Sequence, residues 1–197
     1  MNDQLIRESF HRLILHRLHH ARDTLVLDEL GLRHGKCRAD IAIVNGRLIG
    51  YEIKSNEDSL RRLEEQIQVY SAVFDRASVI TEKRHLESVV ARLPKWWGVI
   101  LCELRRDGDI GFETVRRGDL NVRVDPTAIA QLLWKAEAAE ILESLGEPPN
   151  LLRECRSVLY ERLAAAIDLA QLQRRVRDCL RHRRGWRYPR PVSLGGD

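Results

Sequence analysis

Three charged residues interrupt two apolar, β-branched segments that flank Asn45-Gly46. Asp40 lies in the first segment, and Glu52 and Lys54 lie in the second. Aspartate, glutamate and lysine are all depleted in strands, although on an exposed edge strand such charges simply face water. The functional interpretation is a hard-cation site. Two carboxylates on adjacent strands can hold Mg²⁺ through oxygen ligands, and a lysine beside them can orient or help deprotonate the water that attacks a phosphodiester.

The length of the loop around Asn45-Gly46 decides whether these side chains meet. Apolar runs around Asn-Gly are typical of a β-hairpin, and strand alternation places Glu52 and Lys54 on one face. A two-residue turn would leave Asp40 and Glu52 on opposite faces. An odd-numbered loop, such as three residues with Gly46 in a left-handed conformation, would put both on one face. We therefore expect a bulge in or beside this turn.

Apolar periodicity predicts the elements that position these residues. An amphipathic helix is expected over residues 3–20, and Ser55 or Asn56 is expected to cap a second helix over 57–74. A third helix is expected over 83–92, before Pro94. The expected strands are residues 24–31, 38–44, 47–54, 77–81, 97–102 and 110–115. The sequence therefore predicts an α/β fold in the order helix, three strands, helix, strand.

The composition changes character after residue 126. Two helices are expected, over 127–145 and 151–183, separated by Glu147-Pro148-Pro149-Asn150. We therefore divide the chain into a main domain, residues 1–120, and a helical extension, residues 121–197, that ends in an arginine-rich tail.

Composition excludes several classes of protein. With 197 residues, 44% hydrophobic and 31% charged, the chain can bury a core and is not compositionally disordered. No run of about 18 apolar residues predicts a transmembrane helix, and the charged start lacks a signal-peptide core. The four cysteines are far apart in the sequence. We therefore expect reduced thiols in a cytoplasmic protein that has no membrane partner.

The segment Arg-Ala-Asp-Ile-Ala-Ile-Val-Asn-Gly, followed by Tyr-Glu-Ile-Lys-Ser, resembles the PD-(D/E)XK nuclease superfamily. The element order over residues 3–81 is similar to its common core. With the later Trp-Trp-Gly-Val, these segments also resemble a family of small uncharacterised bacterial and phage proteins placed in that superfamily. The resemblance implies a restriction-endonuclease-like αβββαβ core with a mixed sheet, followed by a C-terminal helical extension. Ala39 stands where the name of the superfamily has proline.

The resemblance also implies roles within the hairpin. Asp40 and Glu52 would be metal ligands, and the Ile53 carbonyl could be a further ligand. Lys54 would be the catalytic lysine. The implied cofactor is Mg²⁺, with Mn²⁺ as a substitute.

Residues outside the hairpin receive implied roles as well. Gln66 and Tyr70 resemble the Gln-x-x-x-Tyr helix motif of RecB-type members and lie one turn apart; the alternative is a solvated glutamine and a core tyrosine. Many members supply another acidic residue before the aspartate strand. Glu29 is the first candidate for this additional metal ligand, and Glu8 is the second. The alternative for Glu29 is that it is simply an exposed carboxylate at the end of a strand.

The C-terminal tail carries the basic excess of the chain. Residues 171–197 contain eight arginines and two aspartates, whereas the rest of the chain is nearly neutral. Arginines interleaved with aromatic residues suit phosphate contacts and base stacking. The alternative is a helix end whose arginines pair with acidic residues of the body. The expected nucleic-acid-binding residues are Arg181, Arg183, Arg184, Trp186 and Arg187.

These expectations combine into a metal-dependent nuclease with DNA preferred to RNA as substrate. A Mg²⁺-bound water, activated by Asp40, Glu52 and Lys54, would attack the phosphorus. The alternative is a catalytically inactive nucleic-acid-binding or protein-interaction module on the same fold. The sequence does not fix the oligomeric state, and a homodimer through the C-terminal helices is one arrangement that it allows.

Overall fold

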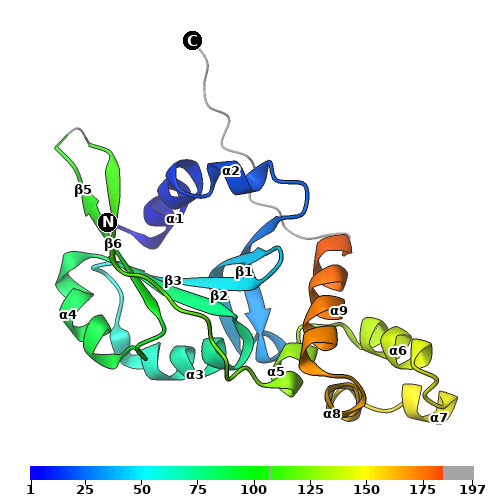
Figure 1. The fold of residues 1–197 in the computed structure, drawn as a ribbon. Coiled ribbons are helices and arrows are strands. Elements are labelled where there is room, and N and C mark those ends of the chain that lie inside the picture. Colours follow the sequence, from blue (N-terminus) through cyan, green and yellow to red (C-terminus); the bar gives the residue numbers. More distant parts are fainter. Residues whose placement is uncertain (107, 184–197) are drawn as a thin grey trace.

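A six-stranded mixed sheet organises the chain in the computed structural model, which describes residues 1–106 and 108–183 (Figure 1). The strands lie side by side in chain order. The pairs β1–β2, β2–β3 and β5–β6 are antiparallel, whereas β3–β4 and β4–β5 are parallel. The strands are β1 (Leu25–Leu32), β2 (Cys37–Val44), β3 (Leu48–Lys54), β4 (Arg76–Thr81), β5 (Gly98–Leu104) and β6 (Ile110–Arg116).

Helices cover both faces of this sheet. Helix α1 (Asp3–Leu13) packs Ile6 and Phe10 on one face, against isoleucines of β2, β3 and β4. Helices α3 (Leu63–Val73) and α4 (Lys83–Arg92) connect the parallel strands and cover the opposite face (Figure 1). The element order is thus helix, three strands, helix, strand, as predicted. No helix in the described ranges is long and apolar enough to cross a membrane.

The first half of the chain departs from the predicted helix boundaries at two places. The helix expected over 3–20 divides into α1 and α2 (His16–His19), which allows Leu15 to be buried while Ile14 stays 48% exposed. The helix expected from 57 begins later, with the 3₁₀ turn Leu60–Arg62 followed by α3. Ser59 caps this turn, because its side chain accepts a hydrogen bond from the backbone of Arg61. The proposed caps at Ser55 and Asn56 are therefore wrong.

The C-terminal helices are more broken than the sequence predicted. In the part of this region that the structure describes, up to residue 183, five short helices replace two long ones. Polar caps and prolines restart the chain, as where Asp168 accepts from the Gln171 amide. Another start lies at Asp125, which accepts from the Thr127 amide. These helices are α5 (Pro126–Ala130), α6 (Lys135–Ser144), α7 (Pro149–Leu152), α8 (Arg156–Ala166) and α9 (Leu169–His182).

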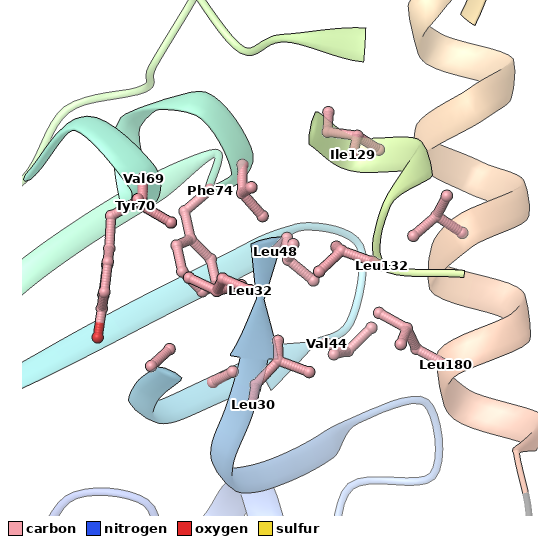
Figure 2. Close-up of a cluster of buried hydrophobic side chains, with 14 of the residues drawn as sticks. Leu30, Leu32, Val44, Leu48, Val69, Tyr70, Phe74, Ile129, Leu132 and Leu180 are labelled. Atoms are coloured by element: carbon pink, nitrogen blue, oxygen red, sulfur yellow. The ribbon is translucent and has the colours of Figure 1, made fainter. Parts of the chain in front are cut away.

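The C-terminal helices share a hydrophobic cluster with the sheet. Leu132, after α5, and Leu180 of α9 face Val44 and Leu48 of the strands (Figure 2). Phe74, at the end of α3, lies in the same cluster. The extension therefore packs on the sheet through the core of the main domain, and the boundary near residue 120 stays a prediction.

Candidate active site

The hairpin loop brings Asp40 and Glu52 to one face of the sheet. The β2–β3 register pairs Ile41 with Tyr51 and Val44 with Leu48, which leaves a three-residue loop. The next rung beyond Ile41 and Tyr51 aligns Asp40 with Glu52. The predicted odd-numbered loop is therefore confirmed.

The expected left-handed glycine and bulge are wrong. Gly46 does not have a positive φ, and the described β2–β3 register runs without a shift. Asn45 closes the loop instead, since its side-chain oxygen accepts a hydrogen bond from the Arg47 amide at 3.0 Å. An asparagine side chain can thus substitute for a backbone turn contact.

Glu52 is the centre of a buried hydrogen-bond network. Its side chain is 2% exposed, and its Oε1 accepts from Lys54 Nζ at 2.6 Å. Gln66 Nε2 donates to the same oxygen, and the Tyr70 hydroxyl donates to Oε2 at 2.5 Å. In Figure 2 the Tyr70 hydroxyl points away from the aliphatic side chains of the core. The two residues predicted on one face of α3 therefore both contact Glu52.

Asp40 is linked to this network through the backbone. Its Oδ2 accepts from the Ile53 amide at 2.7 Å, and its own amide donates to the Tyr70 hydroxyl at 3.3 Å. The structure thus brings together Asp40, Glu52, Ile53, Lys54, Gln66 and Tyr70, all of which the sequence singled out.

Burial raises the pKa values of both carboxyl groups. The pKa of Asp40 rises to about 8, first because of desolvation and then because of the nearby Glu52 charge. Desolvation also raises the pKa of Glu52, opposed chiefly by Lys54. Burial, followed by the charge of Glu52, raises the pKa of the Tyr70 hydroxyl, which therefore stays protonated. Burial thus favours the protonated form of both carboxyl groups, and their neighbouring donors only partly offset it.

Glu29 lies in the same row of carboxylates. Between the paired residues Asp28–Ile41 and Leu30–Ala39, it falls opposite Asp40. Its φ is 57°, a left-handed conformation that costs a non-glycine residue roughly 1–2 kcal/mol. Its Oε1 contacts Arg7 Nη2 at 2.7 Å. Glu29 is thus beside the site but paired with an arginine, and its role as a metal ligand stays a prediction.

The left-handed residue changes the alternation of β1. Leu27 and Leu30 are three residues apart, so strict alternation would place them on opposite faces, yet both are buried in the cluster that contains α3. Ala42 and Ala39, their partners in β2, show the same change. The two strands therefore switch faces together at the rung that carries Glu29.

A cavity of about 420 Å³ opens at this site. Asp40, Glu52 and Lys54 line it together with three acidic residues that the sequence interpretation missed, Asp3, Asp58 and Glu65. None of the three belongs to a recognisable motif. Asp3 reaches the cavity from the start of α1, Asp58 from the loop after β3, and Glu65 from the first turn of α3. Glu8, the second candidate ligand, is exposed on α1, where it accepts from Gln4 at 2.9 Å.

Basic side chains also line the cavity. Lys36 and Arg38 come from the start of β2 and its preceding turn, and Arg62 comes from the turn before α3. All three are exposed. Within residues 1–106 and 108–183, no group of three or more histidine, cysteine, aspartate or glutamate side chains is arranged to hold a metal ion.

The arginines at the end of α9 contact the body of the protein. Arg183 is 9% exposed, donates through Nη2 to Glu137 at 2.5 Å and lies 4.3 Å from the ring centre of Trp134. Arg181 pairs with Asp178 of the same helix at 2.6 Å, and its Nη1 lies 3.9 Å from Asp23 Oδ1. The Arg183 contact is the body-pairing arrangement that the sequence left as the alternative for the tail. Arg184, Trp186 and Arg187 lie outside the described residues.

Fold and site together define a mixed α/β protein with a buried carboxylate–lysine cluster at the end of its central strands. Residues 5–187 match the family described as Bacteriophage P4 protein cII, and the chain belongs to this family. Protein cII of Enterobacteria phage P4 is 27% identical over 144 residues, which are 72% of this chain and 54% of that protein. The chain thus spans about half the length of this relative.

One solved structure also resembles the fold. The SPO1766 protein of unknown function from Silicibacter pomeroyi aligns with 73% of this chain and 90% of its own, at 20% identity and a TM-score of 0.42.

Proposed function

We propose that the protein is a metal-dependent nuclease with a restriction-endonuclease-like αβββαβ core of the PD-(D/E)XK type. The observation that carries this proposal is the convergence of Asp40, Glu52 and Lys54 in one cavity. The side chains of Gln66 and Tyr70 reach Glu52 from α3, at the positions that the resemblance assigns to them.

The donor set fits a hard divalent cation. Mg²⁺ binds oxygen ligands and commonly uses one or two carboxylates while keeping several waters. Asp40 and Glu52 supply two carboxylates that line the same cavity. Asp40 and Glu52 would hold Mg²⁺, or Mn²⁺ in its place, with the Ile53 carbonyl as a further ligand. When bound, the cation would supply Lewis acidity and a water nucleophile near neutral pH.

The other side chains have separable roles in this proposal. Gln66 and Tyr70 hold Glu52 in one orientation from two successive turns of α3. Lys54, 6% exposed, supplies a fixed positive charge on the cavity wall, where a phosphate and the charge that develops on it would be stabilised. The orientation of the carboxylate and the neutralisation of the phosphate thus come from different elements.

The exposed cations around the cavity fit a nucleic-acid substrate. Lys36, Arg38 and Arg62 line the same cavity as the carboxylates, so they can attract phosphates close to the reacting centre. We propose DNA as the substrate, with RNA as the alternative to be tested. The described tail residues Arg181 and Arg183 do not enter this argument, since Arg181 pairs with Asp178 of its own helix and Arg183 pairs with Glu137 of α6.

The test uses Lys54→Met, which removes the charge and keeps most of the buried side chain. Plasmid, linear duplex and single-stranded DNA, and RNA, are incubated with the wild-type chain in Mg²⁺, Mn²⁺ or EDTA. Cleavage is expected with the metal ions, none with EDTA, and a loss of about 100-fold or more in Lys54→Met. The control is Lys95→Ala, an exposed lysine outside the cavity. Equal cleavage by Lys54→Met and wild type, with both folded by circular dichroism, contradicts the assignment.

One observation favours the second candidate, an inactive nucleic-acid-binding or protein-interaction module. Glu52 already accepts hydrogen bonds from Lys54, Gln66 and Tyr70, as a purely structural network would. Such a module should bind nucleic acid or protein without metal-dependent cleavage, and divalent cations should leave its stability unchanged. The cleavage assay and a thermal unfolding series with Mg²⁺ therefore separate the two candidates.

A further inference from the structure

Arg7 of α1 contacts three carboxylates at the edge of the cavity. Its Nη2 lies 2.7 Å from Glu29, 2.9 Å from Asp3 and 3.4 Å from Asp40. The arginine side chain is only 17% exposed. A single guanidinium therefore lies against three carboxylates that line the cavity.

The contact with Asp40 is the weakest of the three. It is the longest, and it competes with Glu29 and Asp3 for the same nitrogen. Arg7 Nε is buried without a hydrogen-bond partner in the described part of the chain. Arginine binds a carboxylate best when two nitrogens engage it in parallel. Asp40 thus has a nearby positive charge but lacks a strong ion pair.

The position of Arg7 is fixed by the packing of its helix. Ile6 and Phe10, on either side of Arg7 in the sequence, are fully buried against the sheet. One turn further along α1, His11 Nε2 lies 2.8 Å from Asp28, the residue before Glu29. The guanidinium is therefore held beside Asp40 by contacts that do not depend on the charge state of Asp40.

We propose that Arg7 is an internal cation that competes with the divalent cation for Asp40 and so limits the metal affinity of the site. This inference rests on the proposed metal site. A cation at Asp40 Oδ1 meets the guanidinium that already contacts this oxygen. With a cation bound, Arg7 would keep its shorter contacts to Glu29 and Asp3.

The sign of the effect follows from charge. Loss of Arg7 strengthens the attraction of Asp40 for every cation, including a proton. A divalent ion carries twice the charge of a proton, so its affinity gains more at a given pH. A lysine at this position would retain the charge and hence most of the competition.

The experiment measures Mn²⁺ binding to the 197-residue chain by electron paramagnetic resonance, with the Mn²⁺-induced rise in melting temperature as the second measurement. Arg7→Gln is expected to bind Mn²⁺ about tenfold more tightly than wild type, because two cations that share one partly buried carboxylate repel strongly. Arg7→Lys is expected to stay close to wild type. The matched control is Arg12→Gln, which removes an α1 arginine that pairs with Asp109 at 2.9 Å, outside the cavity.

Each outcome decides one of the two proposals. Tighter binding in Arg7→Gln alone supports the competition. Equal or weaker binding in Arg7→Gln, with the variant folded in EDTA, overturns the role of Arg7 and leaves the metal site intact. No Mn²⁺ binding by any of the four proteins overturns the metal site, and the competition with it.

Discussion

Asp40→Asn should change how the stability of the metal-free protein depends on pH. The pKa of Asp40 in the folded protein is about 8, against an ordinary value of 3.8. Because the pKa is raised on folding, the protonated Asp40 carboxyl contributes its full stabilisation when the pH is below the ordinary pKa of 3.8. This stabilisation is lost as the pH rises through the folded-state pKa of about 8. Asparagine cannot ionise, yet its side-chain oxygen can still accept the Ile53 amide.

The expected size follows from proton linkage. Between the two pKa values the folded state holds one more proton than the unfolded chain. Each unit of pH increase in this range therefore lowers the free energy of unfolding by up to ~1.4 kcal/mol. The Asp40 side chain is 18% exposed and interacts with Glu52. We therefore expect a smaller effect than this maximum. Between about pH 5.5 and about pH 7.5, the free energy of unfolding of wild type should fall by about 2 kcal/mol more than that of Asp40→Asn.

Urea denaturation in EDTA, followed by circular dichroism, measures this difference. Other titrating groups are shared by the two proteins, so the change in the gap between their stabilities isolates the Asp40–Glu52 pair. Parallel pH dependence in wild type and Asp40→Asn would refute the reasoning. As a further check, Mg²⁺ at 100 times its dissociation constant should stabilise wild type by about 2.7 kcal/mol, while Asp40→Asn should gain little.

Two further predictions concern the surroundings of the carboxylates. Tyr70→Phe removes the hydroxyl that donates to Glu52 and accepts from the Asp40 amide. Chemical denaturation should show that the free energy of unfolding falls by about 1–3 kcal/mol, because buried polar groups are left unpaired. An unchanged free energy of unfolding would contradict the network. Replacing Lys36 and Arg38 by glutamine should weaken DNA binding and reduce the salt slope of log K by about one per lost phosphate contact. A fluorescence anisotropy titration at several salt concentrations measures that slope, and a slope equal to that of Arg17→Gln, an exposed control on α2, would contradict it.

Strand alternation linked the loop length to the position of the carboxylates. It left a two-residue and an odd-numbered loop as the possible outcomes, and the odd-numbered loop was expected because the proposed site needs Asp40 and Glu52 on one face. The observed three-residue loop is the odd-numbered one. The one-turn spacing of Gln66 and Tyr70 likewise placed both on the α3 face that reaches Glu52.

Features that depend on tertiary contacts could not be predicted in the same way. The left-handed Glu29 has no local signal, because the fold imposes it where β1 and β2 switch faces together. The break in the helix expected over 151–183 has a local signal in the cap Asp168, but the packing of Leu163 and Leu172 into one cluster depends on tertiary contacts. The ion pair of Arg183 with Glu137 could not be predicted because the two residues are distant in the sequence, and the assignment of Arg183 to nucleic acid stays a prediction.

The two carboxylates differ in how well the protein neutralises them. Glu52 has a lysine at 2.6 Å and two further donors, whereas Asp40 has a backbone amide and an arginine at 3.4 Å that also contacts two other carboxylates. Asp40 Oδ1 therefore has the weaker protein partners. In the proposed metal site a divalent cation would take the place of the proton on Asp40, and it would displace only the longest of the Arg7 contacts. Glu52, Lys54, Gln66 and Tyr70 would then remain close to their present arrangement. On this reasoning the proposed site would be organised before a cation arrives, and its affinity would be set by the competition at Asp40.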